Sequence, residues 1–92
     1  MKHYKILIKG YVQKVGFRYY TRKKAQALGL TGFTENRRDG SVYIEAEGNP
    51  AALDEFAEWC RTGPPLAEVT ETEILPGEPA GYADFVIREG LF

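Results

Sequence analysis

Residues 10–18 (Gly-Tyr-Val-Gln-Lys-Val-Gly-Phe-Arg) have the composition of a loop that could bind phosphate. They follow an apolar, strand-like run at residues 4–8 and lead directly into a segment with helical periodicity. A short turn between a strand and a helix gathers backbone N–H groups at the positive end of the helix dipole, where an anion is stabilised. Arg18, one residue into the helical pattern, adds a guanidinium fork that fits phosphate oxygens. The sequence therefore predicts a phosphate-binding loop that contains one arginine.

Asn36 is the second residue that could take part in this chemistry. It lies near the end of a predicted strand, just before a hairpin turn. Its neutral amide offers a carbonyl acceptor and an NH₂ donor, which can hold a water in line with a bound phosphorus atom. Whether Asn36 reaches the loop depends on the register of the sheet, which the sequence leaves open. An asparagine before a hairpin is most often only a turn residue.

The other reactive side chains have structural interpretations. Arg18 itself could be a surface cation, although a cation at a helix start opposes the dipole and so points weakly to an anionic partner. We expect His3 to be solvated near the terminus and Cys60 to lie in the core on an apolar stripe. Trp59 falls beside that stripe, which suggests a partly exposed packing role. No His, Cys or carboxylate cluster has metal-ligand spacing, so we expect no metal and no other cofactor.

Composition indicates one small cytoplasmic domain. The 92 residues suffice for a single modest core, and the apolar and aromatic content argues against intrinsic disorder. No signal peptide pattern and no apolar run of membrane-spanning length is present. The single cysteine cannot form an intramolecular disulfide, which suits a reducing compartment.

Charge is divided sharply between the two halves of the chain. Residues 1–38 carry ten Lys or Arg against one acid, whereas residues 39–92 carry two Arg against twelve acids. The basic half could handle an anion, small or polymeric. The two halves could equally form a solvated, mutually attracting surface, because charge counts do not locate a site.

The first half of the chain reads as a strand, a helix and a hairpin. Alternation predicts a strand at residues 4–8 that continues toward residue 12, and residues 31–37 and 41–47 read as two strands joined by an Asp-Gly turn. Helical periodicity covers residues 17–28, and Gly29 stands where a left-handed C-terminal cap is expected. The predicted buried stripe of this helix consists of Phe17, Tyr20, Ala25 and Leu28.

The second half adds a helix and two strands. Asn49 as N-cap and Pro50 at the first helical position predict a helix that Gly63-Pro64-Pro65 ends. Its expected buried face consists of Leu53, Phe56, Ala57 and Cys60. A strand at residues 67–75, a loop at residues 76–81 and a short strand at residues 84–88 follow. The order βαββαβ plus a terminal strand predicts an α+β, ferredoxin-like split-βαβ fold, with both helices on one face of a mostly antiparallel sheet.

The sequence resembles the acylphosphatases, a family of small cytosolic hydrolases. One signature of the family stands at residues 10–18, and a second at residues 32–48 (Gly-Phe…Asn…Asp-Gly-Ser-Val…Gly). Further similarity covers Gly-Pro-Pro-Leu-Ala-Glu-Val at residues 63–69 and Phe-Val-Ile-Arg at residues 85–88. The resemblance implies a single acylphosphatase-like domain over residues 1–92. It also implies that the partner is a small acyl phosphate rather than nucleic acid or a membrane. We expect a monomer, although the sequence leaves the oligomeric state open.

The activity that the resemblance implies is metal-free hydrolysis of a carboxyl-phosphate bond, giving a carboxylate and inorganic phosphate. The catalytic arginine and asparagine of the family fall on Arg18 and Asn36. Phosphoryl transfer mainly needs positioning and stabilisation of charge on the phosphate oxygens. We expect this stabilisation from Arg18 and from the backbone N–H groups of Gln13, Lys14, Val15, Gly16 and Phe17.

The sequence departs from the family pattern at three positions. Lys14 stands where the family usually has glycine, so positive φ there would cost on the order of 1 kcal/mol. The lysine could instead add a second cation beside the phosphate, and we expect retained activity with altered affinity. Thr34 and Glu35 replace the residues usual before Asn36, and strand alternation should turn Glu35 to the opposite face.

Two alternatives belong to other functional classes. An RNA-binding module would share the topology and the basic N-terminal half, but it needs paired aromatic residues on two central strands. The predicted strand at residues 41–47 offers only Tyr43. A non-catalytic sensor could keep the loop for an anion without hydrolysing anything, and Lys14 makes this alternative worth testing.

Overall fold

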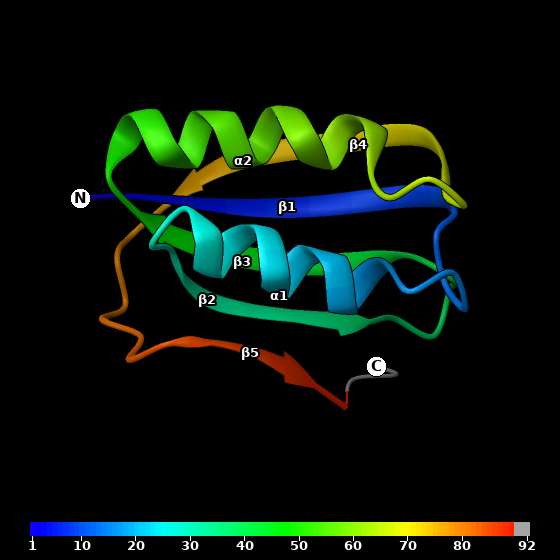
Figure 1. Cartoon of the computed structure of the whole chain (residues 1–92), viewed down its shortest axis with the longest axis horizontal. Helices are drawn as coiled ribbons and strands as arrows, with labels where there is room; N and C mark the ends of the chain where they lie inside the picture. Colours follow the sequence, from blue (N-terminus) through cyan, green and yellow to red (C-terminus); the bar gives the residue numbers. More distant parts are fainter. Residues whose placement is uncertain (90–92) are drawn as a thin grey trace.

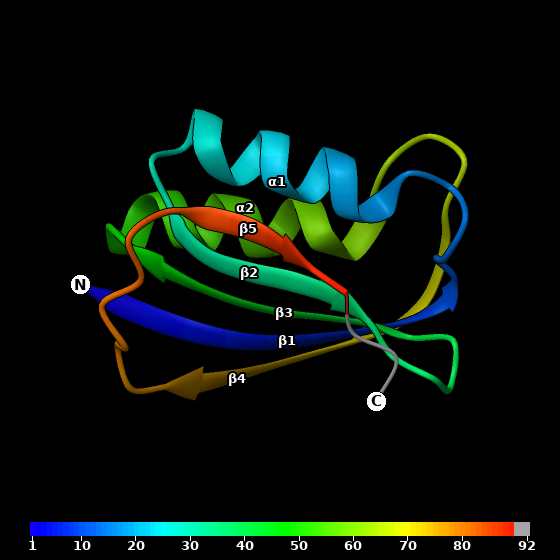
Figure 2. The same ribbon diagram turned by 90° about the horizontal axis from the view of Figure 1, so that it is seen from below.

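Both helices cover one face of a five-stranded sheet in the computed structural model, which describes residues 1–89 (Figures 1 and 2). The first βαβ unit comprises β1 (Lys2–Tyr11), α1 (Phe17–Ala27) and β2 (Thr31–Asn36). The remaining elements are β3 (Val42–Gly48), α2 (Pro50–Thr62), β4 (Glu68–Gly77) and β5 (Phe85–Arg88). None of the helices in residues 1–89 is both long and apolar enough to cross a membrane.

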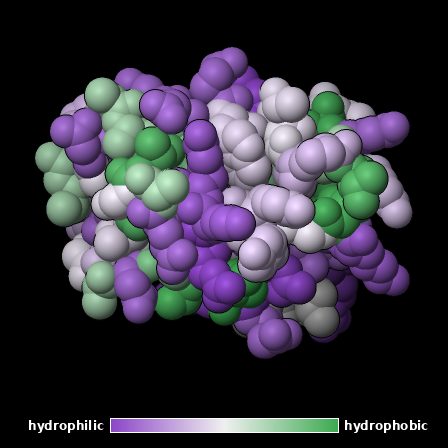
Figure 3. All heavy atoms as spheres, viewed as in Figure 1, coloured by the Kyte–Doolittle hydropathy of each residue, from purple (hydrophilic) through white to green (hydrophobic). Residues whose placement is uncertain are grey.

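The strand order in the sheet is β4-β1-β3-β2-β5. All neighbouring strands are antiparallel except β2 and β5, which run parallel. The predicted ferredoxin-like fold is thus confirmed, and the partner of the last strand, which the sequence left open, is β2. The β1–β3 register sets Ile6 opposite Ile44, and both side chains are fully buried beneath the helices. The surface that Figure 3 shows is mainly hydrophilic, with apolar groups scattered over it.

The buried stripe of α1 differs from the prediction at two positions. Leu28 follows the helix as its C-cap residue and is only partly buried. Phe17, Thr21 and Ala25 are the buried residues of this helix, whereas Tyr20 is 43% exposed. The spacing of four residues points one side chain from each turn at the sheet, and it leaves Tyr20 at the margin, where its ring contacts Tyr19 edge-on. The prediction placed Tyr20 on the stripe from its offset of three from Phe17, but Thr21, at an offset of four, is the side chain that is fully buried.

Helix α2 follows its predicted capping and burial. The Asn49 side chain accepts hydrogen bonds from the backbone N–H groups of Ala51 (2.9 Å) and Ala52 (3.3 Å). All four residues of the predicted apolar face are buried: Leu53, Phe56, Ala57 and Cys60. Trp59 beside them is half-buried and packs on Phe17 and Phe56, as expected.

Strand β4 extends two residues beyond its predicted end. Pro76 pairs with Tyr4 and Gly77 with His3, so the loop begins later than residue 76. A proline lacks the N–H that a central strand needs, but β4 is an edge strand and accommodates it.

The expectation that His3 is solvated is wrong. Its side chain is only 1% exposed, and both ring nitrogens face carboxylate oxygens. Nδ1 lies 2.7 Å from Glu47 Oε1, and Nε2 lies 2.9 Å from Glu45 Oε1. Both contacts are hydrogen bonds when the imidazole carries both of its protons.

The segment that connects β4 to β5 buries this histidine. Glu47 accepts hydrogen bonds from the backbone N–H groups of Ala80 (2.8 Å), Gly81 (2.8 Å) and Tyr82 (3.2 Å), and the Tyr82 ring stacks near His3. Burial raises the pKa of Glu47, but these hydrogen bonds and the one to His3 outweigh it and lower the pKa overall. A residue near the chain start is therefore covered by a segment almost eighty positions away.

Candidate active site

Helix α1 begins without a side-chain cap from any residue that the structure describes. Gly16, at φ 77°, stands at the N-cap position, where no side chain accepts a hydrogen bond from the first turn and no acidic residue follows. The backbone N–H groups of residues 14–18 donate to no acceptor within residues 1–89. Unpaired donors at a helix start need water, a side chain or a ligand, and their dipole favours an anion.

The backbone of Lys14 has a strained conformation. Its φ is 62°, and it is the one residue other than glycine with positive φ in the part of the chain that the structure describes. The position that usually carries glycine in the family thus does require the left-handed region, and the expected strain of on the order of 1 kcal/mol applies. The exposed Lys14 side chain adds a cation at the rim of the loop.

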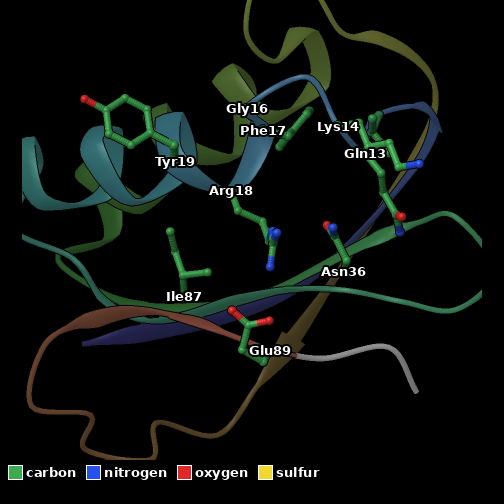
Figure 4. A pocket seen from close by; sticks show the side chains of 10 residues that line it. Gln13, Lys14, Gly16, Phe17, Arg18, Tyr19, Asn36, Ile87 and Glu89 are labelled. Carbon is green, nitrogen blue, oxygen red and sulfur yellow. The ribbon is translucent and has the colours of Figure 1, made fainter.

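A hollow of about 220 Å³ opens where the loop, α1, β2 and the end of β5 meet. Arg18 and Asn36 both line it, from α1 and from the end of β2, and Figure 4 shows their polar ends directed into the same space. Neither side chain has a hydrogen bond or ion pair with another described residue. The register of β2 answers the question that the sequence left open, because it brings Asn36 to the loop.

The Gln13 side chain joins the loop to the β2–β3 turn. Its Nε2 donates to the backbone oxygens of Arg37 (2.7 Å) and Ser41 (2.8 Å). The turn is closed independently, since Asp39 Oδ1 accepts from the Ser41 hydroxyl (2.6 Å) and from its N–H (3.0 Å). These two hydrogen bonds lower the pKa of Asp39.

The other predicted residues occupy the loop in different ways. Lys14, Gly16 and Phe17 line the hollow, but Val15 does not, because its side chain turns into the core. Glu35 lies on the face opposite Asn36, as alternation predicted, and its Oε2 pairs with Arg37 Nε at 3.1 Å. It therefore contributes no charge to the hollow.

Sequence reasoning missed the residues that close the far side of the hollow. Ile87 and Glu89 line it from the end of β5, and Val12 and Tyr19 complete the lining. The parallel pairing of β5 with β2 brings Ile87 level with Thr34. No local pattern marks this pairing, because the paired residues lie more than fifty positions apart in the chain. Elsewhere in residues 1–89, no three His, Cys, Asp or Glu side chains gather into a metal-binding group.

Comparison with known proteins matches nearly the full length of this chain to acylphosphatases. A family model described as Acylphosphatase matches residues 4–87. The acylphosphatase of Thermotoga maritima is 48% identical over 88 residues, which cover 96% of this chain and 98% of that protein.

Solved structures agree with the sequence matches. The crystal structure of acylphosphatase from Bacillus subtilis has a TM-score of 0.92 and 38% identity, covering 96% of this chain and 99% of its own. An acylphosphatase from Coxiella burnetii has a TM-score of 0.91 and 34% identity, covering 95% and 92%. Because sequence and structure agree over the whole of these small proteins, the chain belongs to the acylphosphatase family.

Proposed function

We propose that the hollow at the start of α1 binds the phosphate group of a small acyl phosphate and that Arg18 and Asn36 carry out its hydrolysis. The observation that supports this most is the convergence of unpaired backbone N–H groups, an unpaired guanidinium and an unpaired amide on one space. Donors at a helix start that the protein does not pair favour an anion, and the guanidinium and amide beside them are equally open to a polar ligand.

The loop and Arg18 would bind the three phosphate oxygens. The unpaired backbone donors at residues 14–18 and the guanidinium are held before the substrate arrives, so they need little rearrangement as charge grows on these oxygens in the transition state. Lys14 would add attraction from the rim. Glu89 opposes this positive charge from the other side of the hollow.

Asn36 would orient the attacking water. The water oxygen forms a bond to phosphorus while the bond from phosphorus to the carboxyl oxygen breaks, and the leaving group departs as a carboxylate. The water proton passes to an oxygen of the transferred phosphate, which leaves as inorganic phosphate. A carboxylate is a good leaving group, so the scheme needs no strong general acid, and an amide that only positions the water is sufficient.

Turnover of benzoyl phosphate in the presence of a chelator tests this proposal. We expect Arg18→Ala and Asn36→Ala each to lower kcat/KM by about 10²–10³-fold, by analogy with oxyanion donors and arginine fingers. Arg22→Ala and Asn49→Ala are matched controls, because Arg22 lies outside the hollow on the same helix and Asn49 caps α2 instead. Full activity in both site variants would contradict the proposal, and phosphate binding without turnover by the unmodified chain would identify a sensor instead.

The RNA-binding alternative finds no support on the open face of the sheet. Phe33 is only 5% exposed, and the Arg88 guanidinium lies 3.7 Å from its ring centroid, so a base cannot stack there. Tyr43 is likewise covered, by Arg37 at 4.1 Å. Membership of a hydrolase family favours the enzyme over both alternatives.

We further propose that residues 1–92 act as one monomeric domain in the cytoplasm. A buried, unpaired Cys60, whose burial raises the pKa of its thiol, is consistent with a reducing compartment. Light scattering of the active protein at micromolar concentration tests the oligomeric state. A dimer mass would contradict the monomer and leave the catalytic roles unaffected.

A further inference from the structure

Gln13 is the member of the loop whose side chain contacts the strand end that carries Asn36. Its Nε2 reaches two backbone oxygens, of Arg37 at 2.7 Å and of Ser41 at 2.8 Å, that lie 24 and 28 positions away in the chain. A side-chain amide has two N–H donors, and these contacts use both. The Gln13 amide nitrogen therefore has no donor left for a phosphate oxygen, so its side chain acts on the protein.

The two carbonyl groups do not depend on Gln13 for a partner. The Ser41 oxygen also accepts from the Arg37 N–H at 2.8 Å, and the Arg37 oxygen also accepts from the Gly40 N–H at 3.1 Å. The turn is thus closed by its own backbone and by Asp39. What Gln13 adds is a fixed connection between this closed turn and the loop.

Asn36 needs such a connection because no residue that the structure describes holds its own amide. The side chain has no hydrogen bond with any described residue, so its position follows the backbone at the end of β2. Arg37 is the next residue, and Gln13 binds its carbonyl directly. A shift of the turn relative to the loop would therefore move Asn36 relative to the phosphate.

We propose that Gln13 is a positioning residue, which sets the distance between the phosphate loop and Asn36 and so aligns the attacking water. This inference rests on the proposed function of Asn36. It predicts that loss of the Gln13 amide slows the chemical step while leaving phosphate affinity almost unchanged, because the loop donors and Arg18 remain.

The test is Gln13→Met, which keeps the length of the side chain and removes both donors. We expect kcat with benzoyl phosphate to fall roughly ten- to a hundredfold, since small misplacements of a reacting group have effects of this size. The inhibition constant of inorganic phosphate should change less than about twofold, as expected where only transition-state alignment is lost. Gln26→Met, at an exposed position of α1, is the matched control.

A double-mutant cycle with Asn36→Ala shows whether Gln13 acts through Asn36. In the Asn36→Ala background, Gln13→Met should lower kcat less than about twofold further, because the residue to be aligned is gone. An equal loss in both backgrounds, or a phosphate inhibition constant that rises in step with the fall in kcat, would overturn the inference. If Gln13→Met does not fold, Gln13→Asn, whose shorter amide cannot reach both carbonyls, decides the same question.

The two proposals fail in different ways. If Asn36→Ala collapses kcat but Gln13→Met leaves it unchanged, the positioning role is wrong and the role of Asn36 stands. If Asn36→Ala is itself fully active, the proposed function is wrong, and the positioning role is overturned with it.

Discussion

The two helices of this protein begin in opposite ways. Helix α2 starts at Asn49, whose side chain accepts from the first-turn N–H groups, and Pro50 follows with a backbone preset for a helix. Helix α1 starts at Gly16 with no side-chain cap, after a strained Lys14 and before the cationic Arg18. Every helix start has unpaired donors. At α2 the Asn49 side chain accepts from two of them, whereas at α1 no acceptor within residues 1–89 pairs with them.

A third group of backbone donors shows what an occupied anion site looks like here. The consecutive N–H groups of Ala80, Gly81 and Tyr82 converge on the Glu47 carboxylate. This carboxylate does for the β4–β5 connection what a phosphate group would do for the loop before α1. The difference is that Glu47 belongs to the chain itself, whereas the donors before α1 have no acceptor within residues 1–89.

Removing the negative charge of Glu47 should have the largest effect on the free energy of unfolding. We expect Glu47→Gln to lower the free energy of unfolding by about 2–3 kcal/mol at neutral pH, because charge-assisted hydrogen bonds are lost and an amide NH₂ is set against backbone donors. Because the pKa of Glu47 is lowered in the folded protein, its contribution is present above the unfolded pKa of about 4.3 and is lost as pH falls through the lower folded pKa. The difference in the free energy of unfolding between the unmodified chain and Glu47→Gln should thus become smaller as the pH falls. Urea titrations at several pH values would measure this difference. A difference that stays the same at every pH would contradict the role of the Glu47 carboxylate.

A carboxylate introduced at the start of α1 should occupy the unpaired backbone donors, as Glu47 does at the β4–β5 connection. In Gly16→Asp, a carboxylate lies beside the unpaired donors and repels phosphate, so we expect the inhibition constant of phosphate to rise about tenfold or more. Gly29→Asp is the matched control, because Gly29 has nearly the same φ, 71° against 77°, and its side chain would enter open space. Unchanged phosphate inhibition in Gly16→Asp would show that the anion binds elsewhere.

Removing the N-cap of α2 should lower the stability of the protein without changing its activity. We expect Asn49→Ala to lower the free energy of unfolding by about 1 kcal/mol and to leave kcat and KM unchanged. Added phosphate should still stabilise this variant by the same increment as the unmodified chain, because the ligand binds at α1. Thermal unfolding with and without phosphate measures both quantities, and a smaller increment in the variant would show that the two helix starts are coupled.

Relieving the strain before α1 should have the smallest effect. Lys14→Gly removes a side chain from the left-handed region, so we expect the free energy of unfolding to rise by about 0.5–1 kcal/mol. Loss of the rim cation should at the same time raise KM modestly, which a titration of ionic strength would identify as electrostatic. If stability falls instead, the lysine makes contacts that outweigh its backbone strain.

Local signals predicted the two helices, the hairpin and the split-βαβ order, because capping residues and hydrophobic periods act over a few positions. Asn49 and Gly29 are examples, and Gly29 indeed has the left-handed φ of 71°. The same local pattern identified the loop and Arg18. It could not identify Ile87 and Glu89 as lining residues, the burial of His3 or the contacts of the Gln13 side chain. Each of these depends on the pairing or packing of distant segments, for which short windows of sequence carry no signal.

The position of Trp59 gives the protein a built-in optical probe. It is the single tryptophan of the chain, and its ring centroid lies 5.8 Å from that of Phe17, the first residue of α1. An indole this close to the loop changes its emission when the packing of Phe17 changes. We therefore expect intrinsic fluorescence to follow unfolding without any dye or label, and to follow occupancy of the loop where a bound anion shifts the packing of Phe17.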